Sequence, residues 1–191
     1  EEHIPEEQFG ALAKQLCAFH TSIGADGLMA VVPAKNGGDY GMLFFNSDGS
    51  LGEMCGNGAR CICRWGYENG LAGETQHVET TAGFVTGERI DCRRYRIRLN
   101  DPSVIDLHRS VTVDGTEYDC CYIELGCPGL PHAVVQLDGF DKMDENELRE
   151  LGRALRSSPA FPKGANVNFV ELTGRDVLRI KTFERGVEDF T

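Results

Sequence analysis

Short strand-like segments separated by turn residues recur along the chain, and this pattern constrains the fold more than any other feature. Apolar or alternating runs of a few residues are bounded by Gly, Asp, Asn, Ser or Pro, which favour turns. The runs lie at residues 28–32, 42–45, 77–81, 84–90, 95–99, 111–113, 118–125, 134–137, 167–172 and 177–183. Helical spacing of apolar residues is confined to 9–17, 57–68 and 144–155. The sequence therefore predicts an α/β (α+β) protein in which many strands alternate with a few helices.

The composition is that of an ordinary globular chain and excludes several classes of function. The 191 residues suffice for one domain or two small ones, and 41% of them are hydrophobic. Acidic residues outnumber basic ones by 30 to 19 without any Lys/Arg run, so we expect no nucleic-acid partner. No apolar stretch is long enough to cross a bilayer and no signal peptide opens the chain, so we expect no membrane partner.

The eight cysteines are a high count for a chain of this length. In a small secreted protein they would suggest disulfides. However, Cys61 and Cys63 flank a single residue, and Cys120 and Cys121 are adjacent, so neither pair is suited to an internal bridge. Cys17 and Cys61 lie within apolar helical patterns. We therefore expect most of the cysteines to be reduced core residues of a cytoplasmic protein.

The most informative segment surrounds Cys55, which stands at the start of the predicted helix 57–68. Gly56 and Gly58 allow a ligand to approach the backbone closely. Free N–H groups at a helix start attract anions and also favour a thiolate over a thiol. This segment is thus suited to hold a carboxylate and to supply a base. The alternative is a buried cysteine that merely precedes a Gly-rich helix start.

At this point the sequence resembles the diaminopimelate epimerase family. The longest match is Asn46-Ser47-Asp48-Gly49-Ser50 followed by Glu53-Met54-Cys55-Gly56-Asn57-Gly58-Ala59-Arg60-Cys61. Further matches are Ile23-Gly24-Ala25-Asp26-Gly27, Val78-Glu79-Thr80 with Ala82-Gly83, Pro131-His132-Ala133-Val134, Asn166-Val167-Asn168-Phe169 and Glu184-Arg185-Gly186. Because the matches extend over nearly the whole chain, the resemblance is far more specific than a lone Gly-rich loop.

The resemblance implies two pseudo-symmetric halves, each a curved, mostly antiparallel sheet wrapped around a central helix. We expect residues 1–107 to form the N-terminal half, which carries Cys55, and residues 108–191 to form the C-terminal half. Nothing in the sequence corresponds to the family's opening strand with its Gly-Asn-Asp-Phe/Tyr loop. The family's second cysteine, in an Ala-Cys-Gly-Thr/Ser-Gly motif, would follow Thr191. The pattern therefore predicts a chain truncated at both ends and inactive on its own.

The resemblance also implies a reaction. The family interconverts LL- and meso-diaminopimelate, in lysine and peptidoglycan precursor biosynthesis, without pyridoxal phosphate or a metal. One cysteine thiolate removes the Cα proton, and a second cysteine thiol donates a proton to the opposite face. Cys55 matches one member of this pair. The implied partners are a small amino-acid substrate and a second copy of the chain in a homodimer.

Roles of single residues follow by position from the same resemblance. Asn46, Gly56 and Asn57 would bind the substrate around Cys55. From the second half, the substrate would be bound by Asn166, Glu184 and Arg185. The protonation state of the two cysteines would be set by His132 and Glu184. The family's Gly-Asn-Pro-His is matched by the longer segment 126–132, in which Cys127 stands in place of a substrate-binding Asn.

Three other interpretations remain at this stage. A zinc site could use Cys55, Cys61, Cys63 and a histidine, although the spacing of Cys61 and Cys63 is shorter than the usual two-to-four-residue gap. A related racemase, or an isomerase of phenazine biosynthesis, would share the two-halved architecture but act on another substrate. A non-catalytic fragment would retain half of a site.

Overall fold

The computed structural model describes residues 4–190 and divides into two compact units, each with its own sheet. Unit 1 runs to Asp101 and includes Gly126–Pro128, and unit 2 comprises Pro102–Leu125 and continues from Gly129. Both units combine a sheet with helices, so the predicted α+β class with two halves is confirmed.

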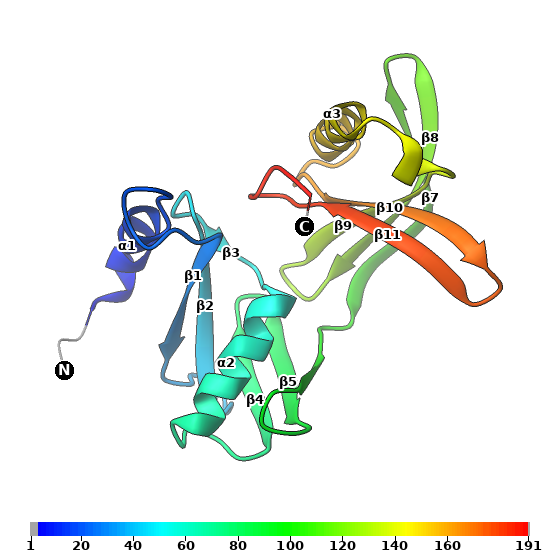
Figure 1. The fold of residues 1–191 in the computed structure, drawn as a ribbon. Coiled ribbons are helices and arrows are strands. Elements are labelled where there is room, and N and C mark those ends of the chain that lie inside the picture. The colour runs from blue at the N-terminus through cyan, green and yellow to red at the C-terminus, as the bar shows by residue number, and fades with distance from the viewer. Residues whose placement is uncertain (1–3, 191) are drawn as a thin grey trace. The chain divides into compact units, whose positions relative to one another are not determined.

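Unit 1 is a six-stranded sheet with one helix on each face (Figure 1). Its elements are η1 (Glu6–Gln8), α1 (Phe9–Leu16), β1 (Gly27–Val32), β2 (Tyr40–Asn46), β3 (Leu51–Gly52), α2 (Gly56–Glu68), β4 (Thr75–Thr80), β5 (Gly83–Arg89) and β6 (Tyr95–Arg98). The strand order is β1-β2-β4-β5-β6, with β3 paired to β2. β2 and β4 are parallel because α2 connects them, and the other pairs are antiparallel.

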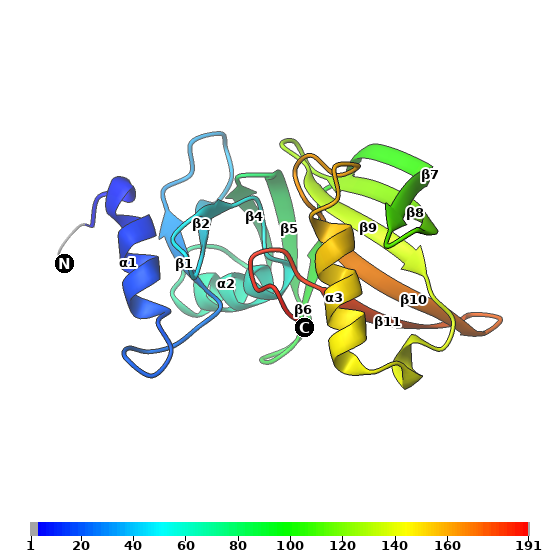
Figure 2. The same cartoon turned by 90° about the horizontal axis from the view of Figure 1, so that it is seen from above.

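Unit 2 is a five-stranded sheet with a helix packed on one face. Its elements are β7 (Pro102–Val113), β8 (Thr116–Leu125), β9 (Leu130–Gln136), η2 (Phe140–Lys142), α3 (Glu145–Arg156), β10 (Asn166–Gly174) and β11 (Val177–Phe183). The order is β11-β10-β9-β8-β7, and only β9 and β10, which α3 connects, are parallel. Figure 2 shows α3 lying over β10 and β11.

The observed division corrects the boundary predicted after residue 107. That position falls inside β7, which runs without interruption from Pro102 to Val113. β7 pairs with β8 along its length, and two register shifts accommodate extra residues. Because a strand in a continuous ladder moves with its partner, the division falls before Pro102 rather than within the strand.

Helix α2 is amphipathic and fills the inner side of the unit 1 sheet. Its buried positions Ala59, Ile62, Cys63 and Gly66 recur at helical spacing. They pack against a core that includes Met42 and Val78. Fully burying an apolar side chain of this size contributes about 1.5–3 kcal/mol. This packing fixes the helix, and with it the residue at its start.

The prediction that most cysteines are core residues is correct only for some of them. All eight are free, but only Cys17, Cys63 and Cys120 are buried. Cys61, predicted to be in the core, is exposed, because its position on α2 lies off the buried stripe formed by Ile62 and Cys63. The prediction for Cys61 rested on the apolar pattern alone and was therefore wrong.

Helix α3 begins where the sequence predicts. The carboxylate of Asp144 accepts hydrogen bonds from the amides of Asn146 (2.9 Å) and Glu147 (3.2 Å), which satisfies two N–H groups of the first turn. Leu148, Gly152 and Leu155 form its buried stripe. A Cβ at Gly152 would lie 2.8 Å from the Phe183 ring, so this glycine permits close packing of α3 on β11.

One arrangement occurs in both units: a helix, a loop with a left-handed glycine, and an antiparallel strand pair. In unit 1 it is α1, Gly24 (φ 76°), β1 and β2; in unit 2 it is α3, Gly164 (φ 67°), β10 and β11. Both helices contact both strands of their pair. The second strand ends at or near a buried phenylalanine, Phe45 or Phe183. This repeat supports the pseudo-symmetry and identifies α3 as the counterpart of α1, not of α2.

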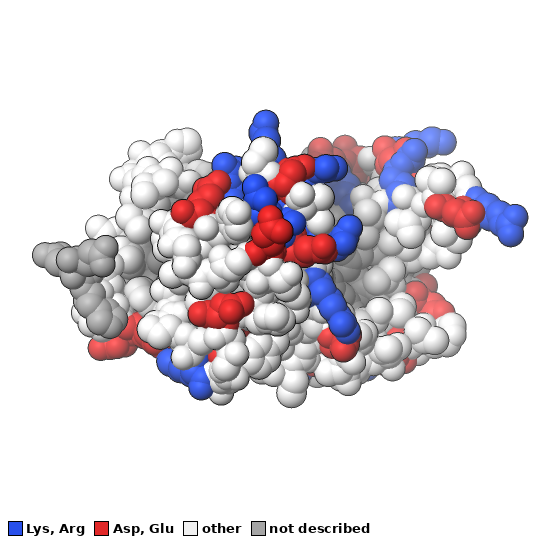
Figure 3. Space-filling model, turned by 90° about the horizontal axis from the view of Figure 1, so that it is seen from below, with Lys and Arg blue, Asp and Glu red and all other residues white. Residues whose placement is uncertain are grey.

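Charged side chains of both signs are interspersed on the face shown in Figure 3. Exposed ion pairs of unit 1 include Arg64 with Glu68 and Arg96 with Glu88, each at 2.8 Å. Such pairs contribute roughly 0–1 kcal/mol each, so they tune the surface rather than specify the fold.

Candidate active site

The chain leading from β2 to Cys55 is held by short-range hydrogen bonds. The amide N–H of Asn46 donates to the carbonyl of Ser50 (2.9 Å), and its side-chain Nδ2 donates to Ser50 Oγ (3.0 Å). Hydrogen bonds from Ser50 to the carboxylate of Asp48 hold the pKa of Asp48 below its usual value. The amide of Ala82 then donates to the carbonyl of Glu53 (3.1 Å). These hydrogen bonds therefore fix the position of the backbone that leads to Cys55.

Cys55 is the N-cap of α2. Its backbone is extended (φ −129°, ψ 111°), and its Sγ accepts a hydrogen bond from the amide of Gly58 at 3.3 Å. The amides of Gly56 and Asn57 belong to the first turn and have no acceptor within the helix. They and the helix dipole favour negative charge at this point. The thiol thus lies beside a group of N–H donors suited to an anion.

Gly58 is required at its position for steric reasons. A Cβ there would lie 2.3 Å from the sulfur of Met29 and 3.4 Å from Cys55 Sγ. Met29 therefore packs directly on the first turn of α2, next to the thiol. Gly56 differs, because a Cβ there would meet only Leu99, at 3.7 Å. Its predicted role in substrate binding rests on its first-turn amide, which has no acceptor within the helix, rather than on lack of space.

The side chain of Asn57 is oriented by the next turn of the helix. Arg60 Nη1 donates to Asn57 Oδ1 (3.3 Å) and to the carbonyl of Gly56 (3.1 Å). Arg60 thus links two predicted substrate-binding residues and adds a positive charge near them. Arg60 lies within the matched sequence motif, but the sequence alone did not indicate a role for it.

A buried polar network fixes the middle of α2 to the sheet. Gln76, fully buried on β4, donates from Nε2 to the carbonyl of Cys63 (2.7 Å) and accepts from Tyr40 Oη (2.6 Å). Burial raises the pKa of Tyr40, which therefore stays a neutral donor. Because every polar atom of Gln76 has a partner, the network orients the helix without leaving a buried group unsatisfied.

In unit 2, His132 and Asn166 are direct neighbours on β9 and β10. Asn168, two residues further along β10, places its Nδ2 3.3 Å from His132 Nδ1 and donates to the carbonyls of Ala133 and Asn166, both at 3.2 Å. Thr182 Oγ1 donates to Asn168 Oδ1 (3.0 Å), and the two carbonyls, which can only accept, fix the orientation of that amide. Asn168 was not among the predicted site residues, although its alternation with Asn166 puts both on one face of the strand.

His132 is a buried imidazole whose neutral form is favoured. Burial, and then the positive charge of Arg185, lower the pKa of His132 below its usual value. A neutral imidazole carries one N–H donor and one acceptor nitrogen. Such a ring suits a residue that influences the protonation of a neighbouring acid.

Asn166 and the preceding loop hold Arg185. The amide N–H of Arg185 donates to Asn166 Oδ1 (2.8 Å), and its Nη1 donates to the carbonyl of Lys163 (3.0 Å). Asn166 is only 6% exposed, so its side chain acts first as an anchor for the Arg185 backbone. The structure therefore brings the predicted residues Asn166, Arg185 and His132 together within unit 2.

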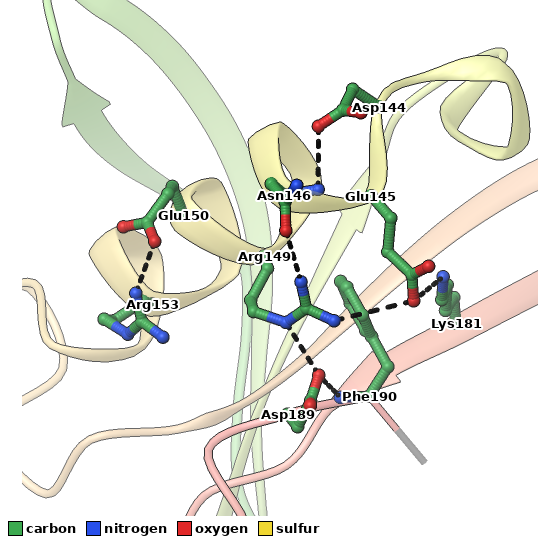
Figure 4. A network of polar contacts seen from close by, with 9 residues as sticks. All are labelled: Asp144, Glu145, Asn146, Arg149, Glu150, Arg153, Lys181, Asp189 and Phe190. Atoms are coloured by element: carbon green, nitrogen blue, oxygen red, sulfur yellow. Dashed lines mark hydrogen bonds and ion pairs between the residues drawn. The ribbon is translucent and has the colours of Figure 1, made fainter.

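The loop that carries Glu184 and Arg185 is tied to α3, as Figure 4 shows. Arg149 donates from Nε to the carboxylate of Asp189 (2.9 Å), and Arg156 pairs with Glu188 (2.6 Å). Phe190 returns the chain to β11 by an isolated bridge to Phe183. The amide of Glu184 donates to the carbonyl of Asp189 (3.0 Å), which closes the loop.

Two further observations bear on the alternatives. Among residues 4–190, no group of three or more His, Cys, Asp or Glu side chains is arranged to hold a metal ion. The proposed zinc ligands diverge, since Cys63 is buried and Cys61 is exposed on α2. Within the same described range, no helix has the length and apolar character needed to cross a bilayer.

Cys127, which the sequence matched to a substrate-binding Asn of the family, lies in a turn. This residue is exposed, is grouped with unit 1, and donates its amide to the carbonyl of Ala82 (3.1 Å). Its match to the Asn stays a prediction.

The comparisons with known proteins agree with these features. A family model described as diaminopimelate epimerase matches residues 1–93. The chain is 40% identical to the diaminopimelate epimerase of Aquifex aeolicus (strain VF5), over 100% of this chain and 66% of that protein. It is 33% identical to the diaminopimelate epimerase of Caldanaerobacter subterraneus subsp. tengcongensis, over 97% of this chain and 72% of that protein. The chain spans 66% and 64% of the lengths of the Aquifex and Hydrogenobaculum relatives.

Solved structures give the same fold at much lower identity. A PhzC/PhzF protein of Clostridium difficile (strain 630) matches with a TM-score of 0.58 and 11% identity, over 99% of this chain and 66% of that chain. A PhzF-family protein of Enterococcus faecalis matches with a TM-score of 0.54 and 17% identity, over 96% and 64% of the two chains. These likenesses concern the fold alone. Because identity exceeds 30% to relatives of which this chain covers more than two thirds, the chain belongs to the diaminopimelate epimerase family.

Proposed function

We propose that the protein carrying this chain interconverts LL- and meso-diaminopimelate by proton transfer at Cα, with Cys55 as one of two catalytic cysteines. The observation that carries this proposal is the placement of the Cys55 thiol as the N-cap of α2, beside the amides of Gly56 and Asn57. Family membership supplies the substrate.

The arrangement around Cys55 suits removal of a weakly acidic proton. A Cα proton next to a carboxylate leaves only when the growing negative charge is stabilised. The amides of Gly56 and Asn57 are placed to donate to the carboxylate, while the thiolate of Cys55 takes the proton. Thiol and thiolate are both accessible near neutral pH, so cysteine can act as base in one direction and as acid in the other.

The group in unit 2 suits recognition of an amino acid. Arg185 carries a planar guanidinium, which pairs with carboxylates through two parallel hydrogen bonds. Glu184, its neighbour, carries the opposite charge and suits the substrate ammonium. Asn166 fixes the backbone of Arg185, and neutral His132 supplies an N–H donor. In this proposal the substrate-binding set is thus Asn46, Gly56, Asn57, Asn166, Glu184 and Arg185.

The remaining expectations belong to the same proposal. The reaction proceeds without pyridoxal phosphate or metal, the protein forms a homodimer, and it resides in the cytoplasm. The eight free cysteines support the last point, since reduced thiols are typical of that compartment.

The test is an assay for conversion of LL- to meso-diaminopimelate by the full-length protein that carries this sequence, without added cofactor. Cys55→Ser should abolish conversion while the circular dichroism spectrum is unchanged. Cys61→Ser is the matched control, because Cys61 is an exposed cysteine on the same helix. Turnover by Cys55→Ser at the wild-type rate would remove Cys55 from the mechanism.

A further inference from the structure

Unit 2 contains a buried carboxylate that the proposed reaction does not use. Glu124 on β8 is only 8% exposed, yet each of its oxygens has a strong partner. Tyr122 Oη donates to Oε1 at 2.6 Å, and Lys163 Nζ donates to Oε2 at 2.7 Å. Burial alone would raise the pKa of Glu124, but the hydrogen bonds from Lys163 and Tyr122 bring it below its usual value. The group is therefore a charged carboxylate in an ion pair.

This ion pair fixes the turn between α3 and β10 onto β8. The turn is closed by a hydrogen bond from the amide of Gly164 to the carbonyl of Phe161 (2.8 Å). Phe161 stacks on Tyr122 with ring centroids 5.3 Å apart and an interplanar angle of 9°. Glu124 and Tyr122 project from one strand, so the stack and the ion pair hold two points of the same turn.

Arg109 completes the attachment from β7. Its guanidinium lies 4.0 Å from the centroid of the Tyr122 ring, and its Nη1 donates to the carbonyl of Ala160 (3.4 Å). Because a cation is attracted to the face of an aromatic ring, the guanidinium of Arg109 helps to hold the Tyr122 side chain in this position. The turn is thus held by β7 and β8 as well as by its own hydrogen bond.

The same turn determines where the Arg185 side chain lies. The carbonyl of Lys163 accepts from Arg185 Nη1 (3.0 Å), and Asn166, three residues later, accepts from the Arg185 amide (2.8 Å). The Cβ position of Gly164, between them, is 3.4 Å from Arg185 Cδ. Segment 163–166 therefore contacts the backbone, the stem and the guanidinium of Arg185.

From these contacts we infer that Glu124 and Lys163 are positioning residues, whose ion pair holds the turn that aims Arg185 at the carboxylate of the substrate. The inference rests on the proposed function for the identity of that carboxylate. Neither residue touches the substrate in this account; both act through Arg185. Only the glutamate of this pair is buried, while the Lys163 side chain is 54% exposed, and an ion pair that solvent reaches adds little net stability, which fits a role in geometry.

The test compares Lys163→Met with Lys163→Arg, which keeps the charge, in the full-length protein. Lys35→Met is the matched control, because Lys35 also pairs with a glutamate, Glu6 at 3.1 Å, but belongs to unit 1. We expect Lys163→Met to raise the KM for diaminopimelate about tenfold with kcat changed by less than about threefold, the loss of one hydrogen bond to a charged group. Lys163→Arg should restore KM, and Lys35→Met should leave it unchanged.

Two further measurements separate positioning from mere stability. In an Arg185→Gln background, Lys163→Met should cause no additional rise in KM. Hydrogen exchange of the peptide spanning 184–186 should be faster in Lys163→Met than in Lys35→Met, while exchange in β2 stays the same. Unchanged KM and exchange in Lys163→Met, or equal effects of Lys35→Met, would overturn the inference. A wild-type protein without conversion would instead contradict the proposed function, and the exchange measurement would still decide whether the ion pair positions Arg185.

Discussion

The two copies of the helix-and-strand-pair arrangement end in loops that are stabilised by different forces. In unit 1 the loop after β2 is held by Asn46, Asp48 and Ser50 through hydrogen bonds within the loop itself. In unit 2 the loop after β11 also has internal hydrogen bonds, but ion pairs from Arg149 and Arg156 on α3 hold it in addition from outside.

This difference matches the chemistry that each loop supports. A thiol that exchanges a proton needs a fixed backbone and a helix start, which unit 1 provides at Cys55. A residue that binds a carboxylate needs a correctly placed cation, which unit 2 provides at Arg185. On the proposed function, Cys55 of unit 1 supplies one of the two proton-transfer groups and Arg185 of unit 2 binds a substrate carboxylate, and each prediction below tests that assignment.

The largest effect is expected at Cys55. Cys55→Ser replaces the thiol with a hydroxyl that is far less acidic, so kcat should fall by about 10³-fold or more. The thermal midpoint should change little, since serine is also a good N-cap. Kinetics at saturating substrate, together with thermal unfolding, measure both quantities. A variant that keeps kcat but loses stability would make Cys55 a structural cap.

The next effect is expected at Arg185. Arg185→Gln removes a charged partner of the carboxylate, so KM should rise about 10- to 100-fold. If recognition and chemistry are divided between the units, kcat should be much less affected. Steady-state kinetics over a wide range of substrate concentrations would show this. A fall in kcat as large as that of Cys55→Ser would contradict the assignment of Arg185 to substrate binding.

A smaller effect is expected at Gly58, where the geometry around Cys55 can be disturbed without changing its chemistry. Gly58→Ala forces Met29 away from the first turn of α2, so we expect a loss of about 1 kcal/mol in unfolding free energy. Gly56→Ala is the stability control, because its Cβ meets only Leu99 at an ordinary distance. Its change should stay within about 0.5 kcal/mol. Equal denaturation midpoints for the two variants would show that Met29 packing is unimportant.

The smallest effect is expected from pH. The pKa of His132 is lower in the folded protein than its usual 6.5, so the unfolded chain binds more protons between these two values. Stability is therefore retained above about pH 6.5 and decreases as the pH falls towards the folded-state pKa. His132→Gln keeps an acceptor for Asn168 but does not titrate. Its thermal midpoint should decline less than that of the wild type between about pH 7 and 5, and parallel curves would contradict the assignment of a buried neutral ring.

Much of the fold follows from the sequence because local signals agree with packing. The helix predicted at 57–68 is α2 to within one residue, and the predicted cap Asp144 does cap α3. The first nine residues of β7, 102–110, were missed for a clear reason. None of them is buried and only Asp106 and Arg109 are partly buried, so this part of the strand carries no alternation of buried and exposed positions.

The site was predictable where the chemistry lies within one short segment. Cys55, Gly56 and Asn57 are adjacent, and the helix start assembles them. Glu124 and Lys163 were not found because they are 39 residues apart and meet only through the packing of β8 against a turn.

The most direct test of the division between the units is isotope exchange at Cα in D₂O with saturating diaminopimelate. The account predicts that Arg185→Gln regains most of the wild-type rate of deuterium incorporation and inversion once substrate saturates. It predicts that Cys55→Ser inverts neither epimer at any concentration and exchanges the Cα proton of at most one, through the remaining cysteine. Inversion of both epimers by Cys55→Ser at the wild-type rate, or failure of Arg185→Gln to recover at saturation, would contradict the account.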